Sequence, residues 1–351
     1  MLGGRAAAQS EAARGVKAAV LREAGRLGPE SWPRPVIGAG ELLLRLRGCG
    51  LCGSDIAKIG ADATTVPVVL GHELVGDVVE AGAGVTGFAV GDRAVAAHHV
   101  PCGVCHFCRR GSESMCASFK TSHLDPGGFA EYVRVPVANV HHATFKIPRH
   151  VSDEAASFVE PLACCLRAVR RARVAPGDTA AVIGLGSIGC LFVQLLRRAG
   201  ARVIGVDLLA ERLALARQLG ADAAGTPDSG APLVRELSDG RGADHVIVTG
   251  GGTAVLPWAT AVARDGGSIH YFAGGAGDVL PMPLDVLYKR ELTLTATYSS
   301  SPADLAAAFS LVVEGEVSTA PLISHRLPLD RVDEGVALMR RQAALKVFVT
   351  P

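Results

Sequence analysis

Hydrophobic and polar positions follow two different patterns along the chain. From Val16 to about Arg149, apolar runs of strand length are separated by glycine and proline, at 16–21, 41–48, 73–82, 92–98 and 130–135. Such spacing predicts a compact, mostly β domain of the barrel type. From about residue 151, a long helical pattern (151–174) leads into a series in which buried strands and amphipathic helices alternate. Alternation of this kind predicts a parallel, doubly wound sheet.

The second pattern extends almost to the end of the chain. Its strand-like runs are 179–184, 201–207, 244–251 and 268–275, with helical runs at 187–200 and 209–221. The tail has a further strand-like run at 292–300, a helix at 303–315 and a final strand at 345–351. The expected fold class is therefore α/β, with a mostly β domain and a doubly wound parallel-sheet domain.

Composition excludes several classes of function. The 351 residues exceed what one core usually organises, so two domains are expected. A net charge of +1 leaves no basic field for nucleic acid or a membrane surface, and no apolar run approaches the roughly 20 residues that span a bilayer. Residues 1–15 are rich in Ala, Gly and Arg and do not read as a secretory signal, so we expect a mobile extension and a cytoplasmic protein. With nine cysteines and no export signal, metal binding is a better explanation than disulfides.

A glycine-rich loop follows the strand at 179–184. Gly184, Gly186 and Gly189 have G-x-G-x-x-G spacing between a strand and a helix, which is the context that makes this motif specific for a dinucleotide. The first glycine permits the tight turn, the second lets the backbone approach the pyrophosphate, and the third lets the helix lie close to the sheet. The expected cofactor-binding residues of the loop are Gly184, Leu185, Gly186, Ser187, Ile188 and Gly189.

Asp207, at the end of the next strand, points to the choice of dinucleotide. A carboxylate there accepts hydrogen bonds from the adenosine ribose and repels a 2′-phosphate. Leu208 and Leu209 follow, where an enzyme that uses NADP more often has a basic side chain. Arg212 is close enough to contribute to the site but does not outweigh Asp207, so NAD is the expected cofactor.

Four closely spaced cysteines predict a structural metal site. Cys102, Cys105, Cys108 and Cys116 have C-x2-C-x2-C-x7-C spacing. Four thiolates crowd negative charge unless a cation neutralises them, and tetrahedral zinc satisfies all four and leaves no open position. Cysteine sets of this size also bind iron–sulfur clusters, but a stand-alone electron-transfer protein would not need the dinucleotide motif.

A second metal site is indicated by three separate segments. Cys52 lies in a glycine-flanked turn, His72 and Glu73 lie in "GHE", and Glu160 lies in "VEP". Cysteine, histidine and carboxylate together can form a zinc site that keeps one position open for water or substrate. Cysteines 49, 164, 165 and 190 read instead as small buried hydrophobes, and His98 and His99 as solvated or structural strand-end residues.

These motifs resemble those of the zinc-containing medium-chain dehydrogenases, in particular the polyol (sorbitol-like) and threonine dehydrogenase branch. The resemblance extends from Val16 to the end and rests on "CGSD", "GHE", the four-cysteine lobe, "GGFAEY" (127–132), "VEP" and "GLGSIG". It implies a GroES-like catalytic domain that a Rossmann domain interrupts. The expected divisions are residues 1–15 for the extension, 16–160 for the catalytic domain with its zinc lobe at about 98–120, 161–295 for the Rossmann domain, and 296–351 for the return to the catalytic domain.

The resemblance also implies roles for individual residues. Cys52 and His72 match zinc ligands, while Glu73 and Glu160 both match carboxylates at the metal, and which of the two ligates it stays open. Ser54 matches the hydroxyl that relays the alcohol proton, and Asp55 a partner that orients the ligands. Many relatives carry a histidine that passes this proton on where this chain has Ala57, so the exit route stays open as well. Family resemblance places residues such as Thr249 near the nicotinamide ribose.

The sequence therefore predicts a zinc-dependent oxidoreductase with two zinc ions per chain, one in each cluster. It would transfer a hydride between NAD and a secondary alcohol of a small hydroxylated substrate, of the sugar, polyol, cyclitol or aminocyclitol class. A threonine-type amino-alcohol dehydrogenase is an alternative. A non-catalytic NAD-binding protein and a zinc-free quinone reductase of the same superfamily are less favoured, because the zinc ligands are all present. A homodimer or homotetramer is expected.

Overall fold

The structure is a computed structural model that describes residues 15–62, 64–272, 274 and 277–351. It divides the chain into two compact units, of which unit 1 joins the residues up to Glu160 with Ser301–Pro351 and unit 2 is Pro161–Ser300. The expected mobile extension, residues 1–15, lies outside the described residues apart from Gly15.

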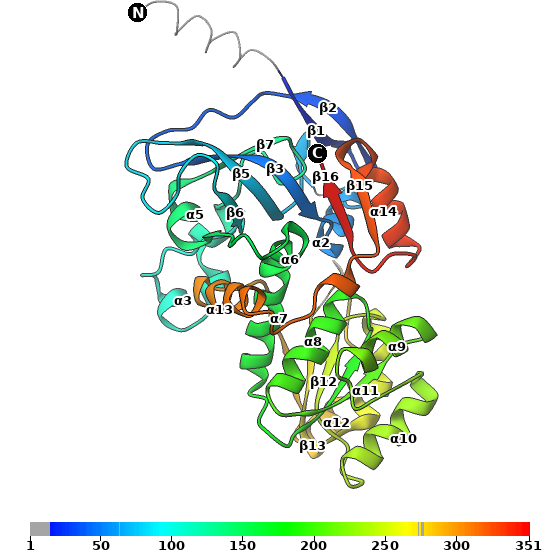
Figure 1. Cartoon of the computed structure of the whole chain (residues 1–351). Helices are drawn as coiled ribbons and strands as arrows, with labels where there is room; N and C mark the ends of the chain where they lie inside the picture. The colour runs from blue at the N-terminus through cyan, green and yellow to red at the C-terminus, as the bar shows by residue number, and fades with distance from the viewer. Residues whose placement is uncertain (1–14, 63, 273, 275–276) are drawn as a thin grey trace, which may run out of the picture. The chain divides into compact units, whose positions relative to one another are not determined.

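Unit 1 is built around a mostly antiparallel sheet in the order β15-β16-β3-β5-β6-β8, with β7 also paired to β3. Two strands from the end of the chain therefore complete a sheet that the first part of the chain begins, and Figure 1 shows the red β16 beside the end of the blue β3. The strands are β3 (Leu42–Gly50), β5 (Glu73–Ala81), β6 (Arg93–Ala96), β7 (Tyr132–Val135), β8 (Thr144–Lys146), β15 (His325–Pro328) and β16 (Val347–Thr350).

A smaller sheet in the order β2-β1-β4 packs on the same core. It contains β1 (Val16–Glu23), β2 (Arg26–Trp32) and β4 (Val68–Val69). The core takes side chains from both sheets, among them Leu21, Leu44 and Val349, which are fully buried. The helical segments of unit 1 are α2 (Gly53–Ile59), α3 (His106–Arg109), η1 (Glu113–Met115), α4 (Ala117–Thr121), α5 (Val137–His142), α6 (Asp153–Ser157), α13 (Pro302–Val313), η3 (Ala320–Leu322), η4 (Leu329–Arg331) and α14 (Val332–Arg340).

The helix expected over 151–174 is two helices, α6 and α7 (Val159–Ala172). Ser152 begins α6, and its hydroxyl accepts a hydrogen bond from the Ala155 amide. Pro161 has no amide hydrogen, so it cannot bond to the carbonyl four residues earlier, and its ring crowds the preceding turn. A continuous helix would need that bond, whereas proline is tolerated in the first turn of a new helix. The break places Glu160 in the first turn of α7.

Unit 2 is a parallel sheet in the order β11-β10-β9-β12-β13-β14. The chain moves outward from β9 to β11, crosses back to β12 and moves outward in the other direction, so the winding reverses between β9 and β12. With right-handed crossovers, this reversal puts the helices on both faces of the sheet, and such a switch point is where doubly wound sheets bind ligands. The strands are β9 (Thr179–Ile183), β10 (Arg202–Val206), β11 (Ala223–Gly225), β12 (Ala243–Val248), β13 (Ala263–Tyr271) and β14 (Thr293–Ala296).

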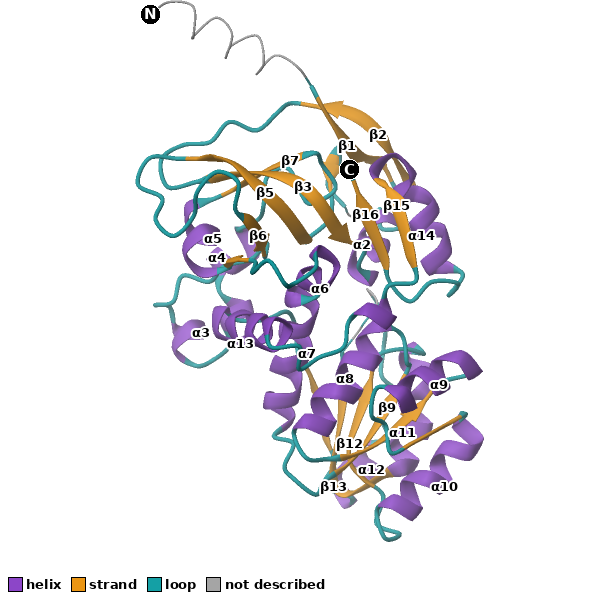
Figure 2. Ribbon diagram, viewed as in Figure 1, coloured by secondary structure: helices purple, strands orange, loops and turns teal. Residues whose placement is uncertain are grey.

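The helices of unit 2 cover this sheet in two groups. Helix α8 contacts α9, as expected if both lie on one face of the sheet. Helix α10 contacts α11, as expected if both lie on the other face. Figure 2 shows these helices in purple beside the orange parallel strands. They are α8 (Ser187–Arg198), α9 (Ala210–Gln218), α10 (Pro227–Leu237), η2 (Gly252–Val255), α11 (Leu256–Val262) and α12 (Leu284–Lys289). Within the described ranges, none of the helices combines the length and the apolar character that crossing a membrane requires.

Candidate active site

Two neighbouring strands bring the expected metal ligands of unit 1 together. Strands β3 and β5 are antiparallel, and Gly50 at the end of β3 pairs with Glu73 at the start of β5. Cys52 follows β3 by two residues and caps α2, while His72 directly precedes β5. One ligand atom from each of Cys52, His72 and Glu73 lies within 4.8 Å of the others. Residues 20 positions apart in the chain thus meet because the two strand ends are paired.

Asp55 orients the histidine of this cluster. Its carboxylate lies 3.3 Å from His72 Nδ1 and accepts hydrogen bonds from the Cys52 and Gly71 amides. Burial alone would raise the pKa of Asp55, but His72 and the Cys52 amide bring it below its ordinary value. Burial likewise lowers the pKa of His72, while Asp55 and Cys52 raise it well above the ordinary value. A carboxylate that holds one ring nitrogen presents the other, Nε2, to a metal, which is the arrangement found at histidine ligands.

Glu73 has a cationic partner that the sequence analysis did not identify. Lys346 is the residue immediately before β16. Its Nζ donates hydrogen bonds to Glu73 Oε1 at 2.6 Å and to Oε2 at 2.7 Å. Lys346 is 2% exposed and Glu73 is 1% exposed. Burial alone would lower the pKa of Lys346, but Glu73, Cys52 and Glu160 raise it, so the ammonium stays charged. The one sign of this residue in the sequence is that it is a single lysine among the apolar residues of the last strand-like run.

Glu160 and Ser54 take different places around this cluster. Glu160 is buried, but it is not part of the three-residue group of possible ligands. Its charge helps to raise the pKa of Lys346. The hydroxyl of Ser54 donates to Cys52 Sγ at 3.3 Å, and Ser54 is exposed. The structure therefore places Cys52, His72, Glu73 and Ser54 together.

Two histidines beside the cluster are packed rather than solvated. The ring of His98 lies 4.7 Å from that of His72 and 3.7 Å from that of His99, measured between centroids. His98 Nδ1 is buried and has no hydrogen-bond partner among the residues that the structure describes. Burial lowers the pKa of His98 well below its ordinary value, and His72 adds to this effect, so the imidazole is neutral. The position of His98 after a strand gave no sign in the sequence that its ring packs on His72.

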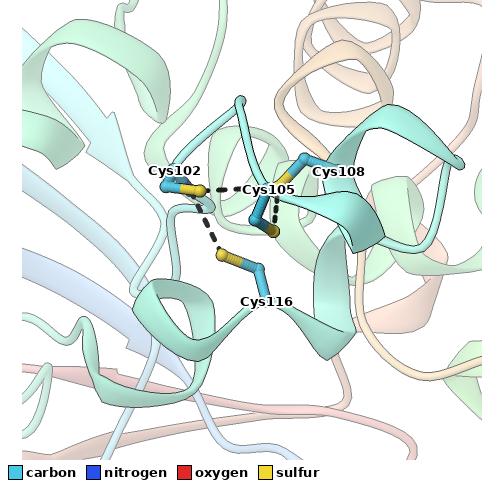
Figure 3. Close-up of side chains that lie close together, drawn as sticks. All are labelled: Cys102, Cys105, Cys108 and Cys116. Atoms are coloured by element: carbon cyan, nitrogen blue, oxygen red, sulfur yellow. Dashed lines mark hydrogen bonds between the residues drawn. The ribbon is translucent and has the colours of Figure 1, made fainter.

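The four cysteines of the lobe point toward a common centre (Figure 3). Their sulfurs lie within 4.8 Å of one another, with Cys105 Sγ at 3.5 Å and Cys102 Sγ at 4.0 Å from Cys108 Sγ. Four sulfurs placed tetrahedrally at about 2.3 Å from one zinc ion lie about 3.8 Å apart. The observed distances therefore suit a zinc ion.

The ionisation of these thiols also fits a cation. The Cys102 amide lowers the pKa of Cys116 to about 6, whereas desolvation and the neighbouring Cys105 raise the pKa of Cys108 to about 12. The protein alone therefore favours some thiolates and opposes others, and a divalent cation at the centre would remove that conflict. Cysteines 49, 164, 165 and 190, predicted to be small buried residues, are buried.

The glycine loop of unit 2 depends on close backbone contacts. Gly184 has a φ of +87°, and a Cβ there would lie 2.8 Å from the Gly250 amide nitrogen. A Cβ on Gly189 would lie 1.9 Å from the Gly184 carbonyl oxygen, so larger residues are excluded where α8 meets the loop. A Cβ on Gly186 would meet no atom within 4 Å, which leaves the first amides of α8 accessible to an anion. The Thr249 hydroxyl donates to the Gly184 carbonyl oxygen at 2.6 Å and thus ties β12 to the loop.

Asp207 lies where the glycine loop meets the end of β10. Its Oδ2 accepts a hydrogen bond from the Leu185 amide at 2.7 Å, and its Oδ1 accepts one from the Leu209 amide at 3.0 Å. Arg212 Nη1 lies 3.6 Å from the same carboxylate. Of the other loop residues, Leu185 and Ser187 are buried and Ile188 is half-buried. The loop, Asp207 and Arg212 are therefore adjacent, as a nucleotide site requires.

The two-unit fold, a catalytic-type donor set and a dinucleotide loop define the class of protein, a metal-dependent oxidoreductase. Two family models match: the alcohol dehydrogenase GroES-like domain over residues 38–148 and the zinc-binding dehydrogenase domain over residues 187–314. The chain is 32% identical to a sorbitol dehydrogenase of Halalkalibacterium halodurans, covering 93% of this chain and 96% of that protein. It is also 32% identical to an L-threonine 3-dehydrogenase of Bacillus velezensis, covering 91% and 94%.

Solved structures agree with this result. The 2R,3R-butanediol dehydrogenase of Bacillus subtilis has a TM-score of 0.84 at 28% identity, covering 96% of this chain and 99% of that one. A Sinorhizobium meliloti protein bound to NADP has a TM-score of 0.86 at 32% identity, with the same coverage. The chain belongs to the zinc-binding alcohol dehydrogenase family. This confirms the expected family, fold class and enzyme class; zinc and a nicotinamide dinucleotide are typical cofactors of the family.

The four-cysteine lobe generates a prediction about metal and stability. Changing Cys105 to Ser should lower the zinc content from close to two ions per chain to close to one and reduce the urea midpoint of unfolding, because a structural zinc contributes folding free energy directly. Metal analysis and urea titration measure both effects. Cys164→Ala, which lies outside the lobe, serves as the control and should keep both ions. A Cys105→Ser protein with full zinc content would refute the assignment.

Proposed function

We propose that the protein oxidises a secondary alcohol of a small, hydroxyl-rich substrate with zinc and NAD. The observation that carries this proposal is the Cys52–His72–Glu73 donor group, whose composition is that of a zinc site with an open position. The sugar, polyol, cyclitol and aminocyclitol classes are the substrates we favour. In support, relatives that are 30% and 29% identical are named D-arabitol-phosphate dehydrogenase and D-xylulose reductase A.

A threonine-type amino-alcohol dehydrogenase is the second candidate, because several similar relatives carry that name. The two candidates differ in what the substrate presents beside its hydroxyl group: further hydroxyls in the first case, and an ammonium and a carboxylate in the second. Neutral polyols need hydrogen-bond partners, whereas an amino acid needs paired charges in the pocket.

The residues in the donor group and beside it have separate roles in the proposed reaction. When bound, zinc supplies a Lewis acid for the substrate oxygen, and the nicotinamide ring accepts the hydride. Asp55 holds the His72 ring by its Nδ1 and so prevents it from turning away. Ser54, whose hydroxyl lies at the Cys52 sulfur, would relay the alcohol proton: its Oγ would accept that proton while its own hydroxyl hydrogen passes to a further acceptor. Proton and hydride would thus go to different acceptors.

NAD is the proposed dinucleotide. The Asp207 carboxylate is held by two backbone amides, which fixes a negative charge where the adenosine ribose hydroxyls would bind. Arg212 is engaged with that carboxylate and is therefore not free to bind a 2′-phosphate. We also propose a cytoplasmic homodimer or homotetramer. The nine cysteines all lie in the described part of the chain and form no disulfide there, as suits a reducing compartment.

A substrate panel tests the function. Sorbitol, xylitol, a cyclitol, an aminocyclitol and L-threonine should be assayed with NAD and with NADP by following the reduced nicotinamide absorbance. The proposal expects the highest kcat/KM for a member of the hydroxyl-rich group with NAD. A clear preference for L-threonine would select the second candidate, and no oxidation of any alcohol by zinc-loaded protein would refute both.

The Asp207–Arg212 pair generates a prediction about the dinucleotide. Removing the carboxylate in Asp207→Ala should weaken NAD binding by roughly tenfold or more, since each charge-assisted hydrogen bond is worth about 1.5–3 kcal/mol. The same change releases Arg212, so NADP binding should improve. Calorimetric titration with both dinucleotides measures these changes, and Asp207→Ala/Arg212→Ala should lose the gain for NADP. Wild-type protein that binds NADP more tightly than NAD would contradict the proposal.

Cys52 and Ser54 should separate metal binding from proton transfer. Cys52→Ala should lose the catalytic zinc and nearly all activity while keeping the lobe zinc and NAD binding. Ser54→Ala should keep both zinc ions and lower kcat by the order of 10²–10⁴ that follows loss of a positioned proton-transfer group. Metal analysis beside kinetics checks both variants. Unchanged turnover of Ser54→Ala, where chemistry is rate-limiting, would show that the proton leaves by another path.

A further inference from the structure

Helix α2 carries a lysine on the same face as the proposed proton relay. The helix buries Asp55 and Ile59, whereas Ser54 and Lys58 are exposed. Residues four positions apart lie on the same face of a helix, with their Cβ atoms about 5–6 Å apart. The Ser54 hydroxyl lies 3.3 Å from Cys52 Sγ, so Lys58 follows the relay one helical turn further along the same exposed face.

The charge of Lys58 acts on the residues around the candidate metal ligands. Burial raises the pKa of Asp55 and His72 lowers it, and Lys58 adds to the lowering. Burial is the main cause of the lowered pKa values of His98 and His99, and Lys58 adds to both. Because interactions between charges weaken with distance, effects on three residues indicate that the ammonium lies close to this group.

The excess positive charge of Lys58 has no counterpart in the protein. The carboxylates of Asp55 and Glu73 are already paired, with His72 and Lys346 respectively. Lys58 itself forms no ion pair with any residue in the part of the chain that the structure describes. A metal at the cluster would add further positive charge. The exposed side of the cluster therefore favours an anion.

The surface of α2 leaves room for such an anion. Ala57 is the other exposed residue beside Lys58, and its methyl group offers no hydrogen bond and little bulk. The lysine ammonium is a compact charge on a flexible four-carbon stem, so it can follow a ligand along this face. A substrate whose reacting hydroxyl lies at Ser54 could thus place a second, charged group at Lys58.

We propose that Lys58 determines the substrate class by binding an anionic group, a phosphate ester or a carboxylate, on the hydroxyl-rich substrate. This inference rests on the proposed function, because it assumes oxidation of an alcohol at the Cys52 cluster. The preferred substrate is then a phosphorylated polyol or a sugar acid, and a neutral polyol is a poorer one. Phosphate and carboxylate share the chemistry that an ammonium recognises, a negative charge with hydrogen-bond acceptors.

Substrates that differ only in charge test this role. Sorbitol, sorbitol 6-phosphate and D-gluconate share a hydroxylated six-carbon chain. Zinc-loaded wild-type protein should oxidise at least one anionic compound with a kcat/KM roughly tenfold or more above that of sorbitol, as one charge-assisted hydrogen bond allows. The gain should appear in KM, because the contact is the same before and during reaction, and it should shrink with added salt. The better of the two anions distinguishes phosphate from carboxylate.

Variants of the lysine identify the cause. Lys58→Met should lower the ratio of anionic to neutral kcat/KM by roughly tenfold or more, since it removes the charged contact. Lys58→Arg should keep the preference for the anion, and Lys58→Glu should reverse it. Lys17→Met is the matched control, because it removes one exposed positive charge from β1 and should keep the wild-type ratio.

Wild-type protein that oxidises sorbitol at least as well as both anionic compounds would overturn the role of Lys58, and so would a Lys58→Met protein with the wild-type ratio. Failure of the proposed function gives a different result, namely zinc-loaded wild-type protein that oxidises none of the three compounds and no other alcohol of the substrate panel.

Discussion

Unit 1 depends on one constraint: a charge that is buried away from water needs a partner of opposite charge. Asp55, His72, Glu73 and Lys346 are each at most 6% exposed, so none of them can rely on water to stabilise its charge. The structure solves this by pairing Asp55 with His72 and Glu73 with Lys346. Each pair includes one potential zinc ligand. The interactions that make burial tolerable therefore also set the orientation of the metal donors.

The two candidate metal clusters of this unit both gather side chains that can bind zinc, but they are built differently and suit different roles. In the lobe, four thiols converge within one short segment, and together they would fill all four coordination positions of a metal there. In the cluster at Cys52, the donors come from the ends of two strands and are of three chemical kinds, with Ser54 exposed beside them. A cluster formed by a single loop can support folding, whereas one assembled from paired strands depends on the fold and can leave room for a substrate.

The nucleotide unit relies on contact distance instead of charge burial. The loop after β9 can approach α8 and β12 only because Gly184 and Gly189 lack side chains. Once the loop is in place, its Leu185 amide donates to Asp207 at the end of β10. The glycines therefore set the position of a carboxylate 18 residues beyond the last of them, which is the group that we propose selects between the two dinucleotides.

Local sequence determined much of this protein: the alternation of strands and helices in unit 2, the glycine loop with Asp207, the four-cysteine lobe, and Cys52, His72 and Glu73 as candidates for a second site. Most of these features depend on spacing within short segments, where neighbours in the chain are neighbours in space. Cys52 and the His72–Glu73 pair come from separate segments, and the resemblance of their motifs to those of a known family linked them. The break between α6 and α7 could also have been read from Pro161, although the apolar periodicity concealed it. Only the tertiary structure decided that Lys346 pairs with Glu73 and that His98 packs on His72, because strand pairing brings together residues 273 and 26 positions apart, and no local pattern encodes such a register.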